Sequence, residues 1–191
     1  MIPMKPIQEI IQACINGDRA SQKQLYYTLV DDLLMVAQRY TRDAGFAHDV
    51  VQNTFVRIFK NLTVYQPDIA SLNTWAKKIC VYEAIAFLRK NKKYTWDVNI
   101  DDVILPFKIE QELDNISIDI LKEKIQALPE EHRTVLNLFY FEEMSHKEIA
   151  TLLQIQESSS RSRLSRAKDQ LRINWKAAFF FLLIKTWIYG S

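Results

Sequence analysis

Residues 158–172 read SSSRSRLSRAKDQLR, and the fold of the C-terminal half depends on whether this stretch is a disordered tail or a helix. Interspersed serine and arginine residues are typical of disordered RNA-binding segments. The small and apolar residues, however, follow the spacing i, i+4, i+7 and i+11, which brings them onto one face of a helix. They are Ser160, Leu164, Ala167 and Leu171, and the arginines fall off that face. The stretch therefore predicts a folded basic helix.

The residues before this helix carry start signals for two more helices. Ser145 and Glu148 form the S-x-x-E pattern of a capping box, which predicts a helix that ends near Leu153. Pro129 predicts another helix, as a first-turn proline. The capped helix and the basic helix together predict a helix-turn-helix. Gln154 stands where a turn glycine is common, so we expect mild backbone strain there.

The N-terminal half shows the period of amphipathic helices. Apolar residues recur every three or four positions and predict helices at about 7–14, 20–40, 47–62 and 72–91. The stretch around Pro67 predicts a loop. The chain has 3 Gly and 5 Pro, which allows few tight turns, and no alternating run bounded by turn residues predicts a strand. We therefore expect an all-α fold with two small helical domains.

Charge is distributed unevenly along the chain, although the formal net charge is only +2. Residues 94–119 include seven acids and one lysine, whereas residues 161–176 include six bases and one acid. Such asymmetry indicates segments with different partners. The acidic segment 94–117 has weak periodicity, and it predicts a linker between the two helical domains.

Several classes of function find no support in the residues. Cys14 and Cys80 lie far apart among apolar neighbours, and no Cys or His pair has zinc-site spacing. We expect two buried thiols in a reducing cytosol, no metal and no cofactor. Asp31 and Asp32 have no catalytic base, metal cluster or glycine loop beside them, which favours a solvated helix face. We expect no enzyme and no small-molecule substrate.

The two ends of the chain carry no targeting pattern. The N-terminus has no basic region followed by an apolar one, so no secretory signal is expected and the protein is assigned to the cytoplasm. The apolar segment 173–191 is interrupted by Lys185 and falls short of a membrane span. It predicts either a helix packed on one of the domains or an anchor for a partner or a membrane surface.

Three stretches resemble a known family. Residues 127–172, ALPEEHRTVLNLFYFEEMSHKEIATLLQIQESSSRSRLSRAKDQLR, resemble region 4 of bacterial sigma factors. Residues 17–62, GDRASQKQLYYTLVDDLLMVAQRYTRDAGFAHDVVQNTFVRIFKNL, resemble region 2, and LNTWAKKI and FLRK within residues 72–90 resemble its continuation. Two such regions without an obvious domain between them look like the extracytoplasmic-function (ECF) subgroup. The resemblance covers about residues 16–93 and 118–172.

The resemblance implies a transcription initiation factor that binds core RNA polymerase and directs it to specific promoters. Its domains would be a region 2-like bundle at 1–93, the linker at 94–117, a region 4-like helix-turn-helix at 118–172 and an apolar extension at 173–191. An anti-sigma factor or another regulator would be a further partner. The alternative is a stand-alone helix-turn-helix regulator, or a degenerate sigma-like protein that binds polymerase without opening promoters.

In the family, region 4 reads the −35 element with its second helix and also touches the beta flap of the polymerase. The matching positions in this chain are Ser158, Ser159, Arg161, Ser162, Arg163 and Arg166. Arginines suit phosphates and guanine edges, and short hydroxyls allow the backbone to approach closely.

Region 2 melts the −10 element and captures an unstacked base between a loop and a neighbouring helix. The loop Leu62–Ser71 and the helix Asn73–Lys90 match these parts, and the resemblance implies DNA contacts at Lys78, Tyr82, Arg89 and Lys90. Family members usually have asparagine where this chain has Tyr82, and a polar residue where it has Ala86. Tyr82 either stacks on a base or belongs to the core.

The resemblance also implies a polymerase contact and a role for the linker. The family's DNA-melting domain docks on the coiled coil of the beta-prime clamp, through a helix motif matched here by residues 49–52, DVVQ. The implied polymerase contacts are Asp49, Val50, Gln52 and Asn53, although His48 and Asn53 stand where the family often has acids. The acidic linker either occupies the RNA path of the polymerase or is a solvated spacer.

Overall fold

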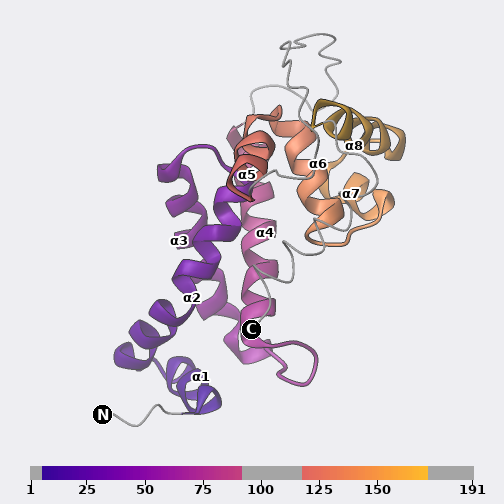
Figure 1. The fold of residues 1–191 in the computed structure, drawn as a ribbon. Helices are drawn as coiled ribbons and strands as arrows, with labels where there is room; N and C mark the ends of the chain where they lie inside the picture. The colour runs from indigo at the N-terminus through magenta and orange to yellow at the C-terminus, as the bar shows by residue number, and fades with distance from the viewer. Residues whose placement is uncertain (1–5, 92–117, 172–191) are drawn as a thin grey trace. The chain divides into compact units, whose positions relative to one another are not determined.

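The computed structural model describes residues 6–91 and 118–171, and every regular element in these two ranges is a helix (Figure 1). The expected all-α fold is confirmed for the described residues. The chain divides into two compact units, Met1–Lys92 and Lys93–Ser191, which we call unit 1 and unit 2. The predicted linker at 94–117 and the apolar extension at 173–191 lie outside the described residues.

Unit 1 is a helical bundle in its described part. Its elements are α1 (Ile7–Ile15), α2 (Arg19–Tyr40), α3 (Ala44–Asn61), the short 3-10 helix η1 (Leu62–Val64) and α4 (Leu72–Asn91). The helices α2, α3 and α4 pack pairwise against one another, and α1 packs on α2 and η1 (Figure 1). All four helices predicted from the apolar period are present.

Two aspartates determine where α2 and α3 begin. The carboxylate of Asp18 accepts the backbone N–H of Ser21 at 2.9 Å, and that of Asp43 accepts the N–H of Phe46 at 3.1 Å. Such N-caps satisfy backbone donors that have no partner within the helix. The helix α3 therefore begins at Ala44, three residues before the predicted start at 47. Its first residues are exposed, so the apolar period did not mark them, and the Asp43 cap determines the start instead.

Buried side chains of α2, α3 and α4 together form the core of unit 1. Fully buried are Leu25 and Leu33 of α2, Val50 and Ile58 of α3, and Ala76, Cys80 and Ala84 of α4. The thiol of Cys80 donates to the carbonyl oxygen of Leu33 at 3.4 Å. Cys14 and Cys80 are both buried thiols outside any disulfide, in agreement with the sequence prediction.

Unit 2 contains a helix-turn-helix. Its described elements are α5 (Ile118–Ala127), α6 (Glu130–Tyr140), α7 (His146–Leu153) and α8 (Glu157–Leu171). The last helix packs against both α6 and α7. Pro129 is the N-cap of α6 rather than a residue of its first turn, so the predicted start was one position early.

The turn chemistry of unit 2 agrees with the sequence prediction. The hydroxyl of Ser145 accepts the backbone N–H of Glu148, and the Glu148 carboxylate accepts the N–H of Ser145 at 2.8 Å, so the capping box is confirmed. The following turn contains Gln154 with φ 57°, in the left-handed region. A side chain at such a position is strained, as predicted.

The predicted stripe of the basic helix forms its buried face. Ser160, Leu164, Ala167 and Leu171 are all buried, with exposed fractions of 0 to 6%. They belong to a core that includes Leu136 and Leu138 of α6 and Ile149 and Leu153 of α7. This burial fixes which side of α8 is left for a partner.

Candidate nucleic-acid interface

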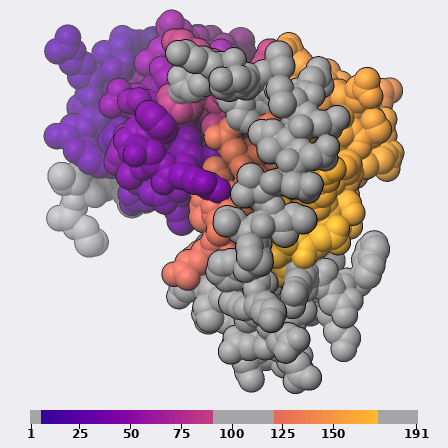
Figure 2. Space-filling view, turned by 90° about the horizontal axis from the view of Figure 1, so that it is seen from above, coloured from indigo at the N-terminus to yellow at the C-terminus, as the bar shows by residue number. Residues whose placement is uncertain are grey.

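The outer face of α8 presents a row of hydroxyl and guanidinium groups. Ser158, Arg161, Ser162, Ser165 and Arg166 are exposed, on the side of the helix away from the buried stripe. The surface of α8 can be followed at the yellow end of the colour range in Figure 2. Arg161 forms a surface ion pair with Glu157 one turn before it. Ser159 is half-buried.

Ser165 was missed as a candidate by sequence reasoning. It lies three and four positions after Ser162 and Arg161, so it shares their helix face. Its exposure could have been predicted from the sequence, because the stripe predicted to be buried already indicated which positions of the helix face outward.

Arg163 differs from the other arginines of α8. Its Nη2 lies 3.2 Å from Oε2 of Glu131 in α6, and the two side chains are 11% and 23% exposed. The contact of Arg163 with DNA, which the resemblance implies, stays a prediction.

Two histidines connect α8 to the rest of unit 2. Nδ1 of His146 lies 2.9 Å from the hydroxyl of Ser160, and the His146 ring stacks on Phe139 with centroids 4.9 Å apart. Nδ1 of His132 lies 3.3 Å from Oε1 of Gln170. Burial lowers the pKa of both imidazoles. The helix α8 is therefore held by polar contacts as well as by its apolar stripe.

Unit 1 contains a hollow of about 240 Å³ between three of its elements. It is lined by Arg57 and Asn61 of α3, Val64 of η1, and Trp75, Ile79 and Tyr82 of α4. Tyr82 is 42% exposed, so the structure excludes its assignment to the core. Trp75 is half-buried and packs against Tyr65, with ring centroids 5.2 Å apart.

One wall of this hollow was not foreseen. Arg57 and Asn61 come from α3, whereas the sequence predicted a pocket between the loop Leu62–Ser71 and α4. Arg57 forms an ion pair with Glu83 of α4; its side chain is 62% exposed and that of Glu83 is 12% exposed. This pair holds a guanidinium group at the edge of the hollow.

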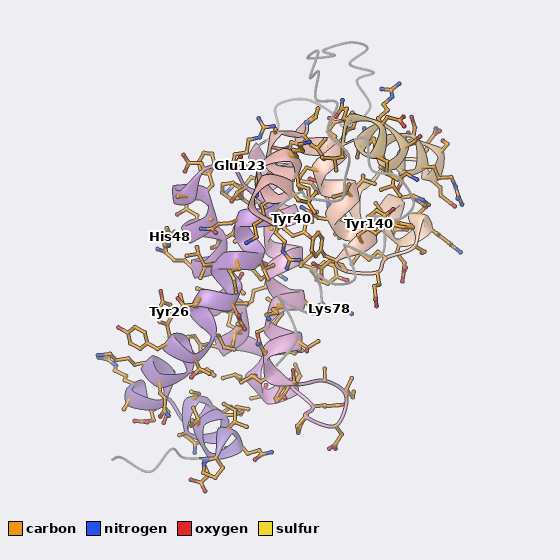
Figure 3. All side chains as sticks on the ribbon, in the orientation of Figure 1. Tyr26, Tyr40, His48, Lys78, Glu123 and Tyr140 are labelled. Carbon is orange, nitrogen blue, oxygen red and sulfur yellow. The ribbon has the colours of Figure 1, made fainter. Side chains whose placement is uncertain are left out.

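Basic residues of α4 lie in different environments. Lys78, Arg89 and Lys90 are exposed, and Figure 3 marks Lys78 on α4. Lys77 is buried instead, with Nζ 3.2 Å from the Asp32 carboxylate. Lys77 therefore does not join the exposed cations of α4, although it is the sequence neighbour of Lys78, because an acid of α2 pairs with it.

The predicted solvated helix face at Asp31 and Asp32 is only half right. Asp31 is exposed as predicted, but Asp32 is partly buried, contacts Lys77 and accepts a hydrogen bond from Asn73 Nδ2 at 2.5 Å. The two neighbouring acids therefore do not form one solvated face. Asp32 connects α2 to α4.

Of the four residues of α3 expected to contact the polymerase, one is buried and three are exposed. Asp49, Gln52 and Asn53 are exposed, and His48 projects from the same helix (Figure 3). Val50 is 0% exposed and packs in the core, so it supports this face from within. Val56 extends the exposed face by one turn, with 51% exposure.

Residues 6–91 and 118–171 contain neither a metal-binding cluster nor a membrane-spanning helix. Within these ranges, no group of three or more His, Cys, Asp or Glu side chains could hold a metal ion. None of the helices in the described part of the chain is long and apolar enough to span a membrane.

Comparisons with known proteins match both halves of the chain. The family model described as Sigma-70 region 2 matches residues 25–94, and that described as Sigma-70, region 4 matches residues 118–171. The RNA polymerase sigma factor SigV of Bacillus subtilis (strain 168) is 30% identical over 143 residues, which are 74% of this chain and 83% of SigV. The ECF RNA polymerase sigma factor SigM of the same organism is 25% identical over 154 residues, 78% of this chain and 91% of SigM.

Solved structures give a more distant likeness. The sigma factor RpoE from Bartonella quintana, solved in complex with the anti-sigma factor NepR, has a TM-score of 0.45 and 22% identity. The likeness covers 78% of this chain and 93% of that chain.

Proposed function

The chain belongs to the ECF sigma factors of bacterial RNA polymerase, and we propose that it recognises the −35 element with α8 and melts the −10 element at the hollow of unit 1. A sigma factor directs RNA polymerase to promoters, and this is the function of the chain. The observation that carries the −35 assignment is the exposed face of α8, where Arg161, Arg166 and the serines lie opposite a fully buried stripe.

The chemistry of this face suits duplex DNA. Guanidinium groups bind phosphates or the O6 and N7 edge of guanine, and each good bidentate base contact contributes about 1–3 kcal/mol of discrimination. Ser158, Ser162 and Ser165 have short side chains that let the helix backbone approach the groove. The same face would therefore provide both phosphate and base contacts.

The hollow of unit 1 has the features of a pocket for one unstacked base. It is smaller than the roughly 300–1,000 Å³ of sites for drug-sized ligands, and Trp75 and Tyr82 give it aromatic walls. Aromatic stacking holds an unpaired base without regard to its identity and contributes about 1–3 kcal/mol. Arg57, Lys78, Arg89 and Lys90 are exposed cations for the phosphates of the melted strand.

The outer face of α3 is the proposed polymerase contact. Asp49, Gln52 and Asn53 offer a charged group and two amides, and they would dock on the beta-prime clamp coiled coil. Unit 2 would touch the beta flap, and an anti-sigma factor or another regulator is a further proposed partner.

The remaining assignments follow from this function. We assign residues 1–93 to the region 2-like domain, 94–117 to an acidic linker in the RNA path, 118–172 to the region 4-like domain and 173–191 to an extension. The protein would act without enzymatic activity or cofactor. Its place would be the cytoplasm, where the polymerase and the promoters are.

Transcription in vitro tests the proposal. Core polymerase supplied with this protein should initiate at a promoter in a way that depends on both the −35 and the −10 sequence. Arg161→Ala with Arg166→Ala should remove the −35 dependence and leave core binding intact. Promoter control without any binding to core polymerase would favour a stand-alone regulator. Core binding without promoter opening would indicate a degenerate sigma-like protein.

A further inference from the structure

The side of α8 that faces α6 carries two long polar residues, seven positions apart. Arg163 contacts Glu131 at 3.2 Å, and Gln170 contacts His132 at 3.3 Å. Seven residues are close to two helical turns, so both contacts belong to one edge of α8. Two consecutive residues of α6 thus hold α8 at two points along its length.

Arg163 is also the least exposed of the three arginines within α8. Its side chain is 11% exposed, whereas that of Arg161 is 64% exposed, and Arg166 is exposed as well. Because the Arg163 side chain is only 11% exposed, a guanidinium that turned outward to a phosphate would give up its 3.2 Å contact with Glu131. The carboxylate left behind would be partly buried, without this partner and close to the DNA, which is unfavourable on both counts.

We propose that Glu131 is a positioning residue that withholds Arg163 from DNA, so that Arg163 sets the orientation of α8 and only the outer face reads the promoter. This inference rests on the proposed −35 function of α8. The helix α6 lies outside the helix-turn-helix pair of α7 and α8. According to this inference, α6 controls the angle at which the exposed face of α8 meets the DNA groove.

The salt dependence of DNA binding separates positioning from direct contact. Each phosphate neutralised by a protein cation changes the slope of log K against log salt by about 0.9. The measurement uses holoenzyme formed from core polymerase and the full chain, with duplexes that carry an intact or a mutated −35 element. Hydrogen exchange of the α8 amides reports how firmly the helix is held.

We expect Arg163→Ala to weaken binding to the −35 duplex and to speed exchange in α8, with the salt slope unchanged. The matched control is Arg166→Ala, an exposed arginine three positions later, which should reduce the slope by about 0.9 and leave α8 protected. A slope loss of that size in Arg163→Ala, with α8 still protected, would overturn the inference. So would unchanged binding together with unchanged exchange.

A charge swap gives a second measurement, since Arg163→Ala can reduce the folded fraction. Arg163→Glu alone should lose −35 binding, and adding Glu131→Arg should recover both α8 protection and most of that binding. Recovered protection without recovered binding would mean that residue 163 faces DNA, and it would overturn the inference. If the wild-type holoenzyme itself does not prefer the intact −35 duplex, the proposed −35 function fails, and this is distinguishable from any result on the variants.

Discussion

The imidazole of His146, the first residue of α7, lies 2.9 Å from the hydroxyl of Ser160 in α8. Ser160 is fully buried in the stripe that holds α8, and the imidazole is also stacked on Phe139 of α6. The His146 side chain, which belongs to α7, therefore contacts both α6 and α8. Its environment is poorly suited to a positive charge.

We predict that acidification destabilises unit 2. Burial lowers the pKa of His146 most, Arg161 and Lys168 lower it further, and Glu157 opposes them. Burial likewise lowers the pKa of His132 most; Arg166 and Arg163 lower it further, and Gln170 and Glu131 oppose them. With native pKa values below the ordinary 6.5, the unfolded state binds more protons as the pH falls. The contribution of the two neutral imidazoles to the free energy of unfolding is complete above about pH 6.5. It is lost as the pH falls through their lowered pKa values in the folded protein.

Thermal unfolding of the full chain between about pH 7.5 and pH 5.5 measures this effect. The wild-type melting temperature should fall over that range. A variant with His132→Gln and His146→Gln keeps hydrogen-bonding side chains that do not titrate, so its decline should be smaller. An equally steep decline in that variant would show that other groups cause it.

Truncation of two neighbouring lysines should affect different properties: that of Lys77 the stability of the protein, and that of Lys78 its affinity for DNA. Lys77→Ala removes one of the two partners described for Asp32, the cation, and should lower the free energy of unfolding by about 1–3 kcal/mol. Lys78→Ala removes an exposed cation, so stability should stay within about 0.5 kcal/mol. Affinity of the holoenzyme for melted promoter DNA should fall instead, with a salt slope reduced by about 0.9. Urea unfolding and DNA titration measure the two effects, and equal stability losses would refute this distinction.

Gln154→Gly should stabilise unit 2. The backbone at Gln154 has φ 57°, which glycine adopts without the steric cost of a Cβ. The greater freedom of glycine in the unfolded chain offsets part of that gain, so we expect up to about 1 kcal/mol. Denaturant unfolding is the measurement, and Gln154→Ala is the control that should show no gain. A loss of stability in Gln154→Gly would mean that the glutamine side chain makes a stabilising contact.

Patterns that depend on helical spacing could be predicted from the sequence. The stripe from Ser160 to Leu171 extends over about three turns of one helix, and the capping box joins Ser145 to Glu148 within about one turn. Their geometry follows from the helix itself and needs no knowledge of the tertiary fold.

Contacts between helices could not be predicted in this way. Glu131 and Arg163 are 32 positions apart, and nothing local distinguishes Arg163 from Arg161. Lys77 and Lys78 read as one basic pair, but consecutive helical residues point in directions about 100° apart, so one can be buried. Arg57 joins the hollow from a helix that the sequence assigned to a different contact. In each case the packing of α-helices decided the role of the side chain.

Tyr82 should contribute to promoter opening through its ring rather than its hydroxyl. Because the residue is 42% exposed, Tyr82→Ala should change the melting temperature little. If the ring stacks on an unstacked base, the variant should lose about 1–3 kcal/mol of open-complex stability, whereas Tyr82→Phe should keep most of it. Permanganate footprinting and competitor-resistant complexes provide the measurement. A loss in Tyr82→Phe equal to that in Tyr82→Ala would indicate hydrogen bonding by the hydroxyl.

The exposed face of α3 separates a sigma factor from a free-standing regulator. Asp49 and Gln52 are three positions apart and both exposed, so they share an edge outside the core. A free-standing regulator has no special use for this edge, and changes there should stay within about 0.5 kcal/mol in stability. In a sigma factor the edge would dock on the polymerase clamp, where truncating one partner of a buried charged contact costs about 2–5 kcal/mol.

We therefore predict that Asp49→Ala with Gln52→Ala leaves the helical circular-dichroism spectrum and the melting temperature nearly unchanged, but sharply reduces capture of core polymerase. Promoter-directed transcription should be lost with it. Gln24→Ala on α2, also an exposed polar residue, is the matched control and should bind polymerase like the wild type. If the folded double variant captured core polymerase as well as the control does, α3 would not carry the clamp contact. Because Val50 is buried beneath this face, a Val50→Ala variant would test stability instead, and its loss of binding would not count as support.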